Sequence, residues 1–537
     1  MIANEQMEQN SNQQQVLTCV DEQNHLKQKQ QQQQQQQQGN KTGSETTIDG
    51  IANKVQYCNK QEQRHRSTGS IIFKVVIASI GFFFFGYQQG ILNLSLKTLD
   101  VIFEIQEDDQ KFYEGLMSCL SPVGAIIGCV ISIYLVKSYS RIRSFFIIDL
   151  ISLLGSIISV VSANVYVFML GRLISGLGVG INTALVPQYV NEISPSALKG
   201  ITGCLLSVLC GLGLVVSNIQ SLGYENDPKQ NDDLGNFWRF AFVFPGALTV
   251  LRSIIFIIFI KNDTASYFMI KGDRKRAEAV LKDIYKEKYV EEEIQNISQE
   301  IEMQKQGLKY WKDLLSRQYF NRVKVGVFLQ FLQQFSGINV VVFYSGKIFE
   351  EIVDDSSIVF VLALMTNVLQ LVCAFLSAYF STRYGRRSLL LNGDIACFFF
   401  LLVFGIVSLI KNYGAASGDV TNPIVIICVF GYMFSFGISL GPIVWAYNSE
   451  ILPEKGLSVA TITNWSSSII IIFFFPMAIN IMPVGYIFFF FSFWCFIGMI
   501  FIKVYVFETK NLTPQEIEMI YNPNNQKKQE QKEINSN

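Results

Sequence analysis

The sequence predicts an all-α membrane protein in which twelve helices cross the bilayer as two six-helix pseudo-repeats. Half of the 537 residues are hydrophobic and only 16% are charged, whereas an ordinary soluble domain carries roughly 25% charged residues. From Ile71 onward, long apolar runs recur along the chain, and a helix needs about 20 mostly apolar residues to cross a bilayer. In addition, two short motifs of the first half recur in the second half in the same order.

Each apolar run is continuous rather than alternating, which favours a transmembrane helix over a strand of a β-barrel. A helix also satisfies its own backbone hydrogen bonds inside the lipid. The twelve expected spans cover residues 71–93, 112–136, 144–162, 165–189, 201–221, 238–260, 322–346, 357–381, 388–410, 423–447, 458–481 and 485–507.

Polar segments flank and divide these spans. The first segment is rich in Gln, with an unbroken run from Gln30 to Gln38, and such a composition cannot bury enough apolar surface to offset the entropy of ordering. The segment after the sixth span is charged, with helical patches such as Arg274–Tyr285. We therefore expect a disordered cytoplasmic tail over 1–68, six-helix bundles over 69–260 and 321–508, a cytoplasmic helical linker over 261–320 and a cytoplasmic tail over 509–537.

The charges of the loops predict the orientation. The loops after the second and eighth spans are basic and contain no acid between their basic residues, which are Lys137, Arg141, Arg143, Arg383, Arg386 and Arg387. The loops on the other side are acidic, as in the stretch from Asp100 to Asp109. Because basic loops stay in the cytoplasm, both termini are expected there.

An internal repeat supports the division into two halves. Tyr189-x-x-Glu192-Ile193-x-Pro195 recurs as Tyr447-x-x-Glu450-Ile451-x-Pro453, and each copy ends the fourth span of its half. Arg141 with Asp149 eight residues later recurs as Arg386 with Asp394 eight residues later, at the start of the third span of each half. Duplicated bundles of this kind place a substrate site between the halves, near the middle of the membrane.

Several classes of function find no support in the residues. The net charge is zero, so nothing favours a nucleic-acid partner. Both histidines, His25 and His65, lie in the polar tail, and the ten cysteines show no metal-ligand or disulfide spacing. There is no nucleophile–base pair and no phosphate-binding loop, so we expect neither an enzyme nor a cofactor.

A set of short motifs carries a resemblance to a known family. The most specific is Gln333-Gln334-Phe335-Ser336-Gly337-Ile338-Asn339 in the seventh span. Other matches, in chain order, are Gly86-Tyr87, Gly171-Arg172, Glu192, Ala197-Leu198-Lys199-Gly200, Gly385-Arg386-Arg387, Gly441-Pro442, Trp445, Asn464-Trp465 and Glu508-Thr509-Lys510. This ordered set, which spans Ile71 to Tyr521, resembles the glucose-transporter-like sugar porters of the major facilitator superfamily.

The resemblance implies a sugar site lined by amides of the seventh span. Gln330, Gln333 and Gln334 share one helix face, and amides both donate to and accept from hydroxyls without placing a charge in the membrane. An alternative is that these amides only bridge helices, for roughly 1 kcal/mol each. The implied sugar contacts are Ser207, Gln330, Gln333, Gln334, Asn339, Tyr344, Gln370, Trp445, Asn464 and Trp465.

Two further expectations concern helix breaks and gating. Gly441-Pro442 can break the tenth span and form a gate, and Trp445 just after it suits stacking on a sugar face, although a tryptophan can also anchor a helix at the membrane interface. For the cytoplasmic ends we expect Glu192 and Glu450 to pair with basic residues and latch the two halves together when the site faces outward. The alternative is that these basic residues only set topology; they are Arg141, Arg172, Arg386 and Arg387.

Departures from the family bear on mechanism. Proton-coupled members carry an Asp where this chain has Gln88, so facilitated diffusion is expected rather than proton symport. Asp149 and Asp394 are the competing proton sites, and we expect both to form structural ion pairs instead. A proton-coupled symporter and a non-transporting sugar sensor of the same fold remain alternatives. By resemblance, a monomer suffices for transport and the plasma membrane is the expected location, although a vacuolar or food-vesicle membrane is equally compatible with these residues. The exact sugar stays open.

Overall fold

The structure is a computed structural model that describes residues 68–195, 198–221, 237–260, 262–306, 311–350, 353, 355–414, 417–510, 512 and 514–521. The expected Gln-rich tail before residue 68 lies outside these residues, as does most of the expected C-terminal tail. Within them, twelve helical segments are long and apolar enough to cross a membrane, which confirms the predicted fold class. Two of the twelve are each built from two consecutive helices.

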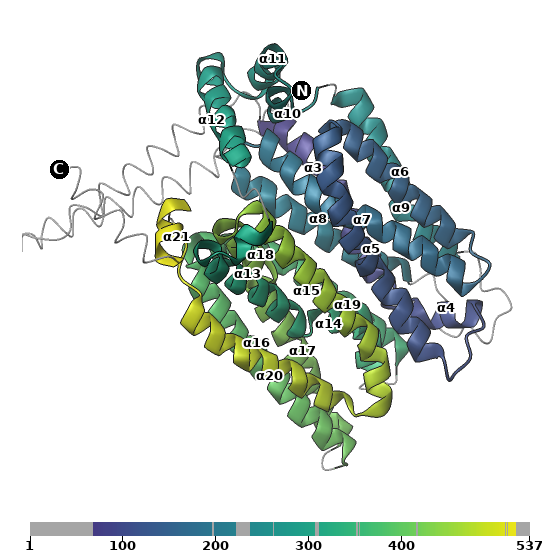
Figure 1. The fold of residues 1–537 in the computed structure, drawn as a ribbon. Helices are drawn as coiled ribbons and strands as arrows, with labels where there is room; N and C mark the ends of the chain where they lie inside the picture. Colours follow the sequence, from purple (N-terminus) through teal and green to yellow (C-terminus); the bar gives the residue numbers. More distant parts are fainter. Residues whose placement is uncertain are drawn as a thin grey trace, which may run out of the picture. The chain divides into compact units, whose positions relative to one another are not determined.

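The helices of the first half form one group and those of the second half another (Figure 1). The first group comprises α3 (Thr68–Gly90), α4 (Leu96–Ile102), α5 (Gln110–Ser138), α6 (Arg141–Val160), α7 (Val165–Ile193), α8 (Lys199–Gln220) and α9 (Phe237–Phe259). The second group comprises α13 (Arg317–Phe335), α14 (Ile338–Glu350), α15 (Ser356–Arg383), α16 (Arg386–Asn412), α17 (Gly418–Ile438), α18 (Leu440–Ile451), α19 (Glu454–Ile481) and α20 (Val484–Tyr505).

Shorter helices connect the halves and follow the last span. These are α10 (Ala265–Ile270), α11 (Arg274–Ile284), α12 (Glu287–Gln306), the 3₁₀ turn Trp311–Leu315 and α21 (Pro514–Tyr521). Side-chain caps set several helix starts, since Thr264 and Asp273 accept hydrogen bonds from the first turns of α10 and α11. Figure 1 shows α10–α12 at one end of the first group and α4 at the other.

Small residues let helices of the first half approach closely. Gly124 of α5 faces Gly176 of α7, where an added Cβ would lie 2.9 Å from the Gly176 Cα atom. One turn further along the same pair of helices, Gly128 approaches the Leu177 carbonyl oxygen and Gly180 approaches Ala125. In lipid, where no hydrophobic effect drives helices together, such close van der Waals packing stabilises helix pairs.

Two of the spans in the second half contain a helix break. Gly337 has a φ of +92°, a conformation that glycine adopts without the clash a Cβ would cause, and it separates α13 from α14. Ser439 (φ −127°, ψ −93°) separates α17 from α18, two residues before Gly441-Pro442. The predicted break in the tenth span is thus confirmed.

The two ends of the bundle differ in how the halves pack. We call the end with the starts of α6 and α16 the Arg141 end, and the end where α14 finishes the Lys347 end. At the Lys347 end one apolar cluster joins both halves, for example Leu92 and Leu96 with Phe343 and Ile348. At the Arg141 end a separate cluster joins the first half to α10–α12, and among the described residues it includes none of α13–α20.

Candidate functional site

A cluster of buried amides lies where α13, α14 and α19 meet. The helical spacing of α13 places Gln330, Gln333 and Gln334 on one face, and the break at Gly337 brings Asn339 of α14 back beside them. All four are buried, as is Asn464 of α19. The sequence predicted each of these residues, and the structure brings them together.

Asn464 is the centre of this cluster. Its amide nitrogen donates to Gln330 Oε1 at 2.6 Å and to Gln333 Oε1 at 2.7 Å, and its oxygen accepts from Gln334 Nε2 at 3.0 Å. Asn339 Nδ2 donates to Gln334 Oε1 and, at 2.7 Å, to Ser468 Oγ. Three helices therefore share one continuous network of neutral donors and acceptors.

The network also reaches the broken tenth span. Gln333 Nε2 donates to the carbonyl oxygens of Leu440 and Gly441, at 2.8 Å each, just beyond the break at Ser439. Among the described residues, the buried Gln330 Nε2 has no hydrogen-bond partner. The arrangement offers exchangeable neutral hydrogen bonds, which suits a polyhydroxylated solute better than an ion.

The remaining predicted contact residues are distributed around this cluster. Trp465 is buried at the seam between halves, packed against Phe84 and Val179 with its ring centroid 5.8 Å from that of Phe85. The Tyr344 hydroxyl donates to the Ile472 carbonyl oxygen at 2.9 Å. Both residues make helix–helix contacts in this structure, so any sugar contact from them stays a prediction.

Among the described residues, no hydrogen bond joins the amide cluster to Ser207, Gln370 or Trp445. Ser207 is exposed and Gln370 is half-buried. Their helices pack together, since a Cβ added at Gly211 of α8 would lie 3.1 Å from the Leu371 Cα atom of α15. Trp445 on α18 is 39% exposed. These three residues remain predicted contacts.

At the Lys347 end, hydrogen bonds and an ion pair join the two halves. The sequence analysis did not predict these contacts. Asn93 Nδ2 donates to Ser345 Oγ at 2.7 Å, and Asn93 Oδ1 accepts from the Gly346 backbone N–H at 3.0 Å. Lys347 pairs with Glu114 of α5. These contacts involve α14, the short helix that also carries Asn339.

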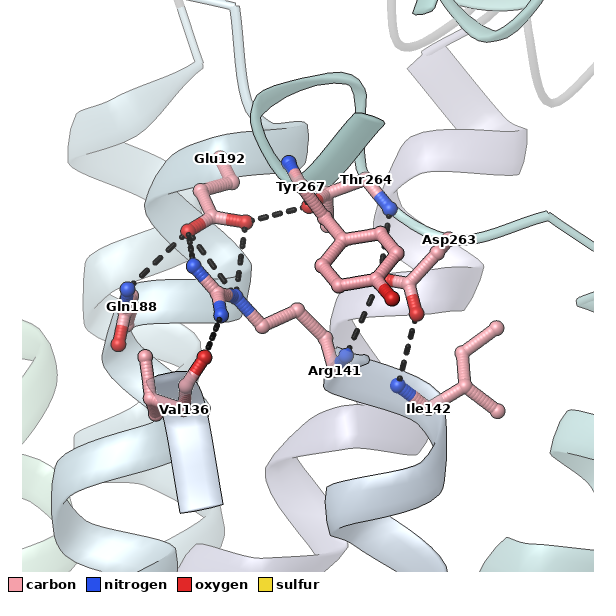
Figure 2. A network of polar contacts seen from close by, with 8 residues as sticks. All are labelled: Val136, Arg141, Ile142, Gln188, Glu192, Asp263, Thr264 and Tyr267. Carbon is pink, nitrogen blue, oxygen red and sulfur yellow. Dashed lines mark hydrogen bonds and ion pairs between the residues drawn. The ribbon is translucent and has the colours of Figure 1, made fainter. Parts of the chain in front are cut away.

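At the Arg141 end, each half holds a polar network of its own, and Figure 2 shows that of the first half. In the first half Arg141 Nη2 pairs with Glu192 Oε1 at 2.8 Å, and Thr264 Oγ1 donates to the other Glu192 oxygen at 2.5 Å. The Asp263 carboxylate accepts the backbone N–H groups of Arg141 and Ile142, at 3.2 and 3.3 Å. It thereby caps the start of α6, where helix N–H groups otherwise lack partners.

The second half repeats this network almost atom for atom. Arg386 Nε bonds Glu450 Oε1 at 3.1 Å, and Thr509 Oγ1 donates to Glu450 Oε2 at 2.5 Å. The Glu508 carboxylate accepts the N–H groups of Arg386 and Arg387, at 2.8 and 3.1 Å. Asp263-Thr264 is therefore the counterpart of Glu508-Thr509, a repeat that sequence comparison missed because only the threonine is identical.

One part of the predicted latch, the pairing of Arg172 with Glu192, is wrong. Arg172 lies 20 residues before Glu192 on the same helix, roughly 30 Å away at 1.5 Å per residue, and it bonds Gln88 Oε1 and, at 3.0 Å, the Gln88 carbonyl oxygen. The Arg387 side chain bonds the Lys503 carbonyl oxygen. Among the described residues, the ion pairs Arg141–Glu192 and Arg386–Glu450 each lie within one half, so a latch between halves stays a prediction for another conformation.

The two candidate proton sites differ. Asp149 forms the expected ion pair: Arg252 Nε donates to both carboxylate oxygens at 3.1 and 3.3 Å, and Ser253 adds a third donor group. For Asp394 the expectation is wrong. Within the described part of the chain, its buried carboxyl has no partner beyond the weak thiol donor of Cys495.

The matched networks at the Arg141 end yield a prediction about stability. Replacing Glu192 by glutamine should destabilise the protein by about 2 kcal/mol, because it weakens charged hydrogen bonds to Arg141, whose side chain is only 3% exposed. Glu450→Gln should cost about 1 kcal/mol or less, since the Arg386 and Glu450 side chains are 21% and 27% exposed. Thermal unfolding in detergent measures both, and equal losses would contradict the argument from burial.

Comparison with known proteins agrees with this architecture. The sequence profile of the family described as "Sugar (and other) transporter" matches residues 74–521. "Hexose transporter 1" of Plasmodium yoelii yoelii is 30% identical over 458 residues, which cover 81% of this chain and 89% of the relative. "Sugar transport protein 10" of Arabidopsis thaliana is 26% identical over 84% of this chain and 91% of the relative.

Solved structures show the same fold. The proton:xylose symporter XylE bound to 6-bromo-6-deoxy-D-glucose superimposes with a TM-score of 0.71 at 21% identity, over 85% of this chain and 100% of that chain. A partially occluded, inward-open conformation of the xylose transporter XylE from E. coli gives a TM-score of 0.71 at 20% identity, over 83% of this chain and 100% of that chain.

Proposed function

The chain belongs to the family of sugar (and other) transporters, and we propose that it carries a hexose-like sugar across the membrane by facilitated diffusion. It is a multi-pass membrane protein of the major facilitator fold. The observation that carries the proposal is the buried, uncharged network of Gln330, Gln333, Gln334, Asn339 and Asn464. Curated relatives named as hexose transporters support the choice of substrate class.

The amides bind sugar by exchanging partners. Each now bonds a neighbouring amide or a carbonyl oxygen, and hydroxyl groups can replace these bonds at little cost because a hydroxyl both donates and accepts. Ser207, Gln370, Tyr344, Trp445 and Trp465 complete the proposed contact set. Their indole and phenol rings provide apolar surface for the C–H faces of a sugar.

Alternating access follows from the different packing at the two ends. The halves are joined at the Lys347 end by Asn93, Ser345 and the Lys347–Glu114 pair. If the basic loops are in the cytoplasm, this end faces outside, and we propose that this conformation is the one closed on the outer side. We propose that residues 69–260 and 321–508 move as two bodies, with 261–320 as the cytoplasmic linker.

In the outward-facing conformation, the Arg141 end would close instead. Charged residues of both halves then gate the site, because their networks present charge on both halves at that end. These residues are Arg141, Glu192, Arg386, Arg387 and Glu450. Only a few kcal/mol of bias suffices to shift such a two-state equilibrium.

Uniport is proposed because of the pair formed by Gln88 and Arg172. Arg172 is completely buried and bonds an amide there, and an amide side chain does not take up and release a proton at neutral pH. Transport therefore proceeds without a coupled ion. As separate proposals, a monomer suffices for transport and the plasma membrane is its location.

Two measurements test this function. Labelled hexose should enter transporter-deficient cells with saturable kinetics, whereas a sensor of the same fold would bind the sugar without flux. In sealed vesicles the sugar should equilibrate but not accumulate when a pH gradient is imposed. Uphill accumulation that is lost in Asp149→Asn or Asp394→Asn would establish proton symport instead.

A further inference from the structure

Charged side chains of both halves surround a cavity at the Lys347 end. The cavity has a volume of about 290 Å³. Its walls come from α4 and α5 of the first half and from α14 and α19 of the second half. The charged residues that line it are Lys97, Asp100, Lys111, Glu114, Lys347 and Glu350.

These residues form an outer and an inner group. The outer pair, Lys97 with Glu350, has a separation of 2.7 Å and side chains that are 65% and 37% exposed, so it contributes little to the contact between halves. The inner residues Asp100 and Glu114 are almost completely buried. Lys347 reaches them from the second half and pairs with Glu114.

Among the described residues, both inner lysines contact Glu114 and neither forms an ion pair with Asp100. Asp100 and Glu114 face each other, and among the described residues Asp100 Oδ1 and Glu114 Oε2 lack a hydrogen-bond partner. A single proton between them would make an O–H···O bond and remove the repulsion. Lys347 pairs with Glu114, and Lys111 lies 3.6 Å from the same carboxylate.

We propose that Asp100 and Glu114 form a proton-binding site on the outer side of the protein, and that a bound proton stabilises the closed contact between the halves. This inference rests on the proposed alternating access. It concerns the state of the outer gate and moves no proton across the membrane.

The pKa of Asp100 supports this role. Burial, and then the neighbouring Glu114, raise it from 3.8 to about 8, although Lys347 and Lys111 lower it in part. When the halves separate, the wall formed by Lys347, Glu350 and Ile479 leaves and water enters, so the effect of burial is lost. Loss of the positive charge of Lys347 acts in the opposite direction, but it is a smaller effect on the pKa of Asp100 than burial is. The closed state therefore holds the proton more tightly than the open state.

The direction of the pH effect can be derived from this difference. The stabilisation of the closed state is complete below the ordinary pKa of a carboxyl and is lost as the pH rises through about 8. Other charged residues nearby, such as Glu107 and Asp108, lie in the exposed connection between α4 and α5. Acid outside the membrane should thus close the gate, and alkali should open it.

Distances between spin labels on the two halves test the proposal. We would label Gln106→Cys and Ser356→Cys, both at exposed positions of the Lys347 end, in a chain whose tail cysteines Cys19 and Cys58 are serine. Between pH 6 and 8, the ratio of closed to open populations should fall by up to about tenfold per pH unit. In the same pH series, the Asp100→Asn variant should stay in the closed state, with a ratio of closed to open populations that does not change with pH. Asp100→Glu should restore the pH dependence of this ratio.

The outcomes separate the two proposals. A pH response that persists in Asp100→Asn, or a wild-type chain without one, would overturn the proton site even if hexose uptake saturates normally. If instead the labels respond as expected but no hexose enters cells, the proposed function fails and the proton site stands. Glu107→Gln, an exposed acid outside the cavity, is the matched control and should respond as wild type does.

Discussion

Uptake of labelled hexose should fall by roughly 10- to 100-fold when Gln333 is replaced by alanine. The substitution leaves Asn464 Nδ2 without one of its acceptors and frees the Leu440 and Gly441 carbonyl oxygens at the break between α17 and α18. An unsatisfied buried polar group costs about 1–3 kcal/mol, and each 1.4 kcal/mol corresponds to a factor of ten in affinity. The loss should appear first as weaker sugar binding.

A matched control distinguishes a sugar contact from helix bridging. Asn367 is also a buried amide in a span, but in the described part of the chain its Nδ2 bonds only the Ala363 carbonyl oxygen of its own helix. Asn367→Ala should therefore leave uptake near the wild-type level, with surface expression measured for both variants. If Gln333→Ala lowered expression or thermal stability while the sugar affinity of the remaining protein stayed unchanged, the amides would only bridge helices.

Replacing Asp149 by asparagine should destabilise the protein by about 3–5 kcal/mol, the usual cost of removing one partner from a buried ion pair. Arg252 would stay buried against the ring of Phe145 with only uncharged acceptors, which are the new amide oxygen at position 149, Asn182 and the Ala78 carbonyl oxygen. The free energy of unfolding, or the thermal unfolding temperature in detergent, measures this loss.

Asp394→Asn is the matched experiment in the other half and should change stability by no more than about 1 kcal/mol. Asp149 and Asp394 both lie eight residues after the first arginine of their helix, but the residues that correspond to Arg252 and Ser253 are Ile497 and Gly498. Because no cation of the described residues pairs with Asp394, the neutral amide removes no ion pair. A large loss for Asp394→Asn would show that this carboxyl has a partner or a role that the present conformation does not show.

The twelve spans, the duplication and the identity of the central amides could all be predicted from the order of the amino acids. Apolar runs and the spacing of Gln330, Gln333 and Gln334 are local properties, so they can be counted along the chain. The break in the tenth span was also predictable, because proline lacks the N–H that a continuous helix needs.

Which charges meet became clear only when the helices were placed in space. The opposite charges of Arg172 and Glu192 favour an ion pair, but the two residues lie far apart along α7, and Arg172 bonds Gln88 instead. Asp149 and Asp394 have the same place in the repeat, yet a partner from α9 reaches only the first. Asp100, Glu114 and Lys347 come from three separate helices. Pairing depends on helix lengths and on packing between distant segments, which no local pattern in a sequence records.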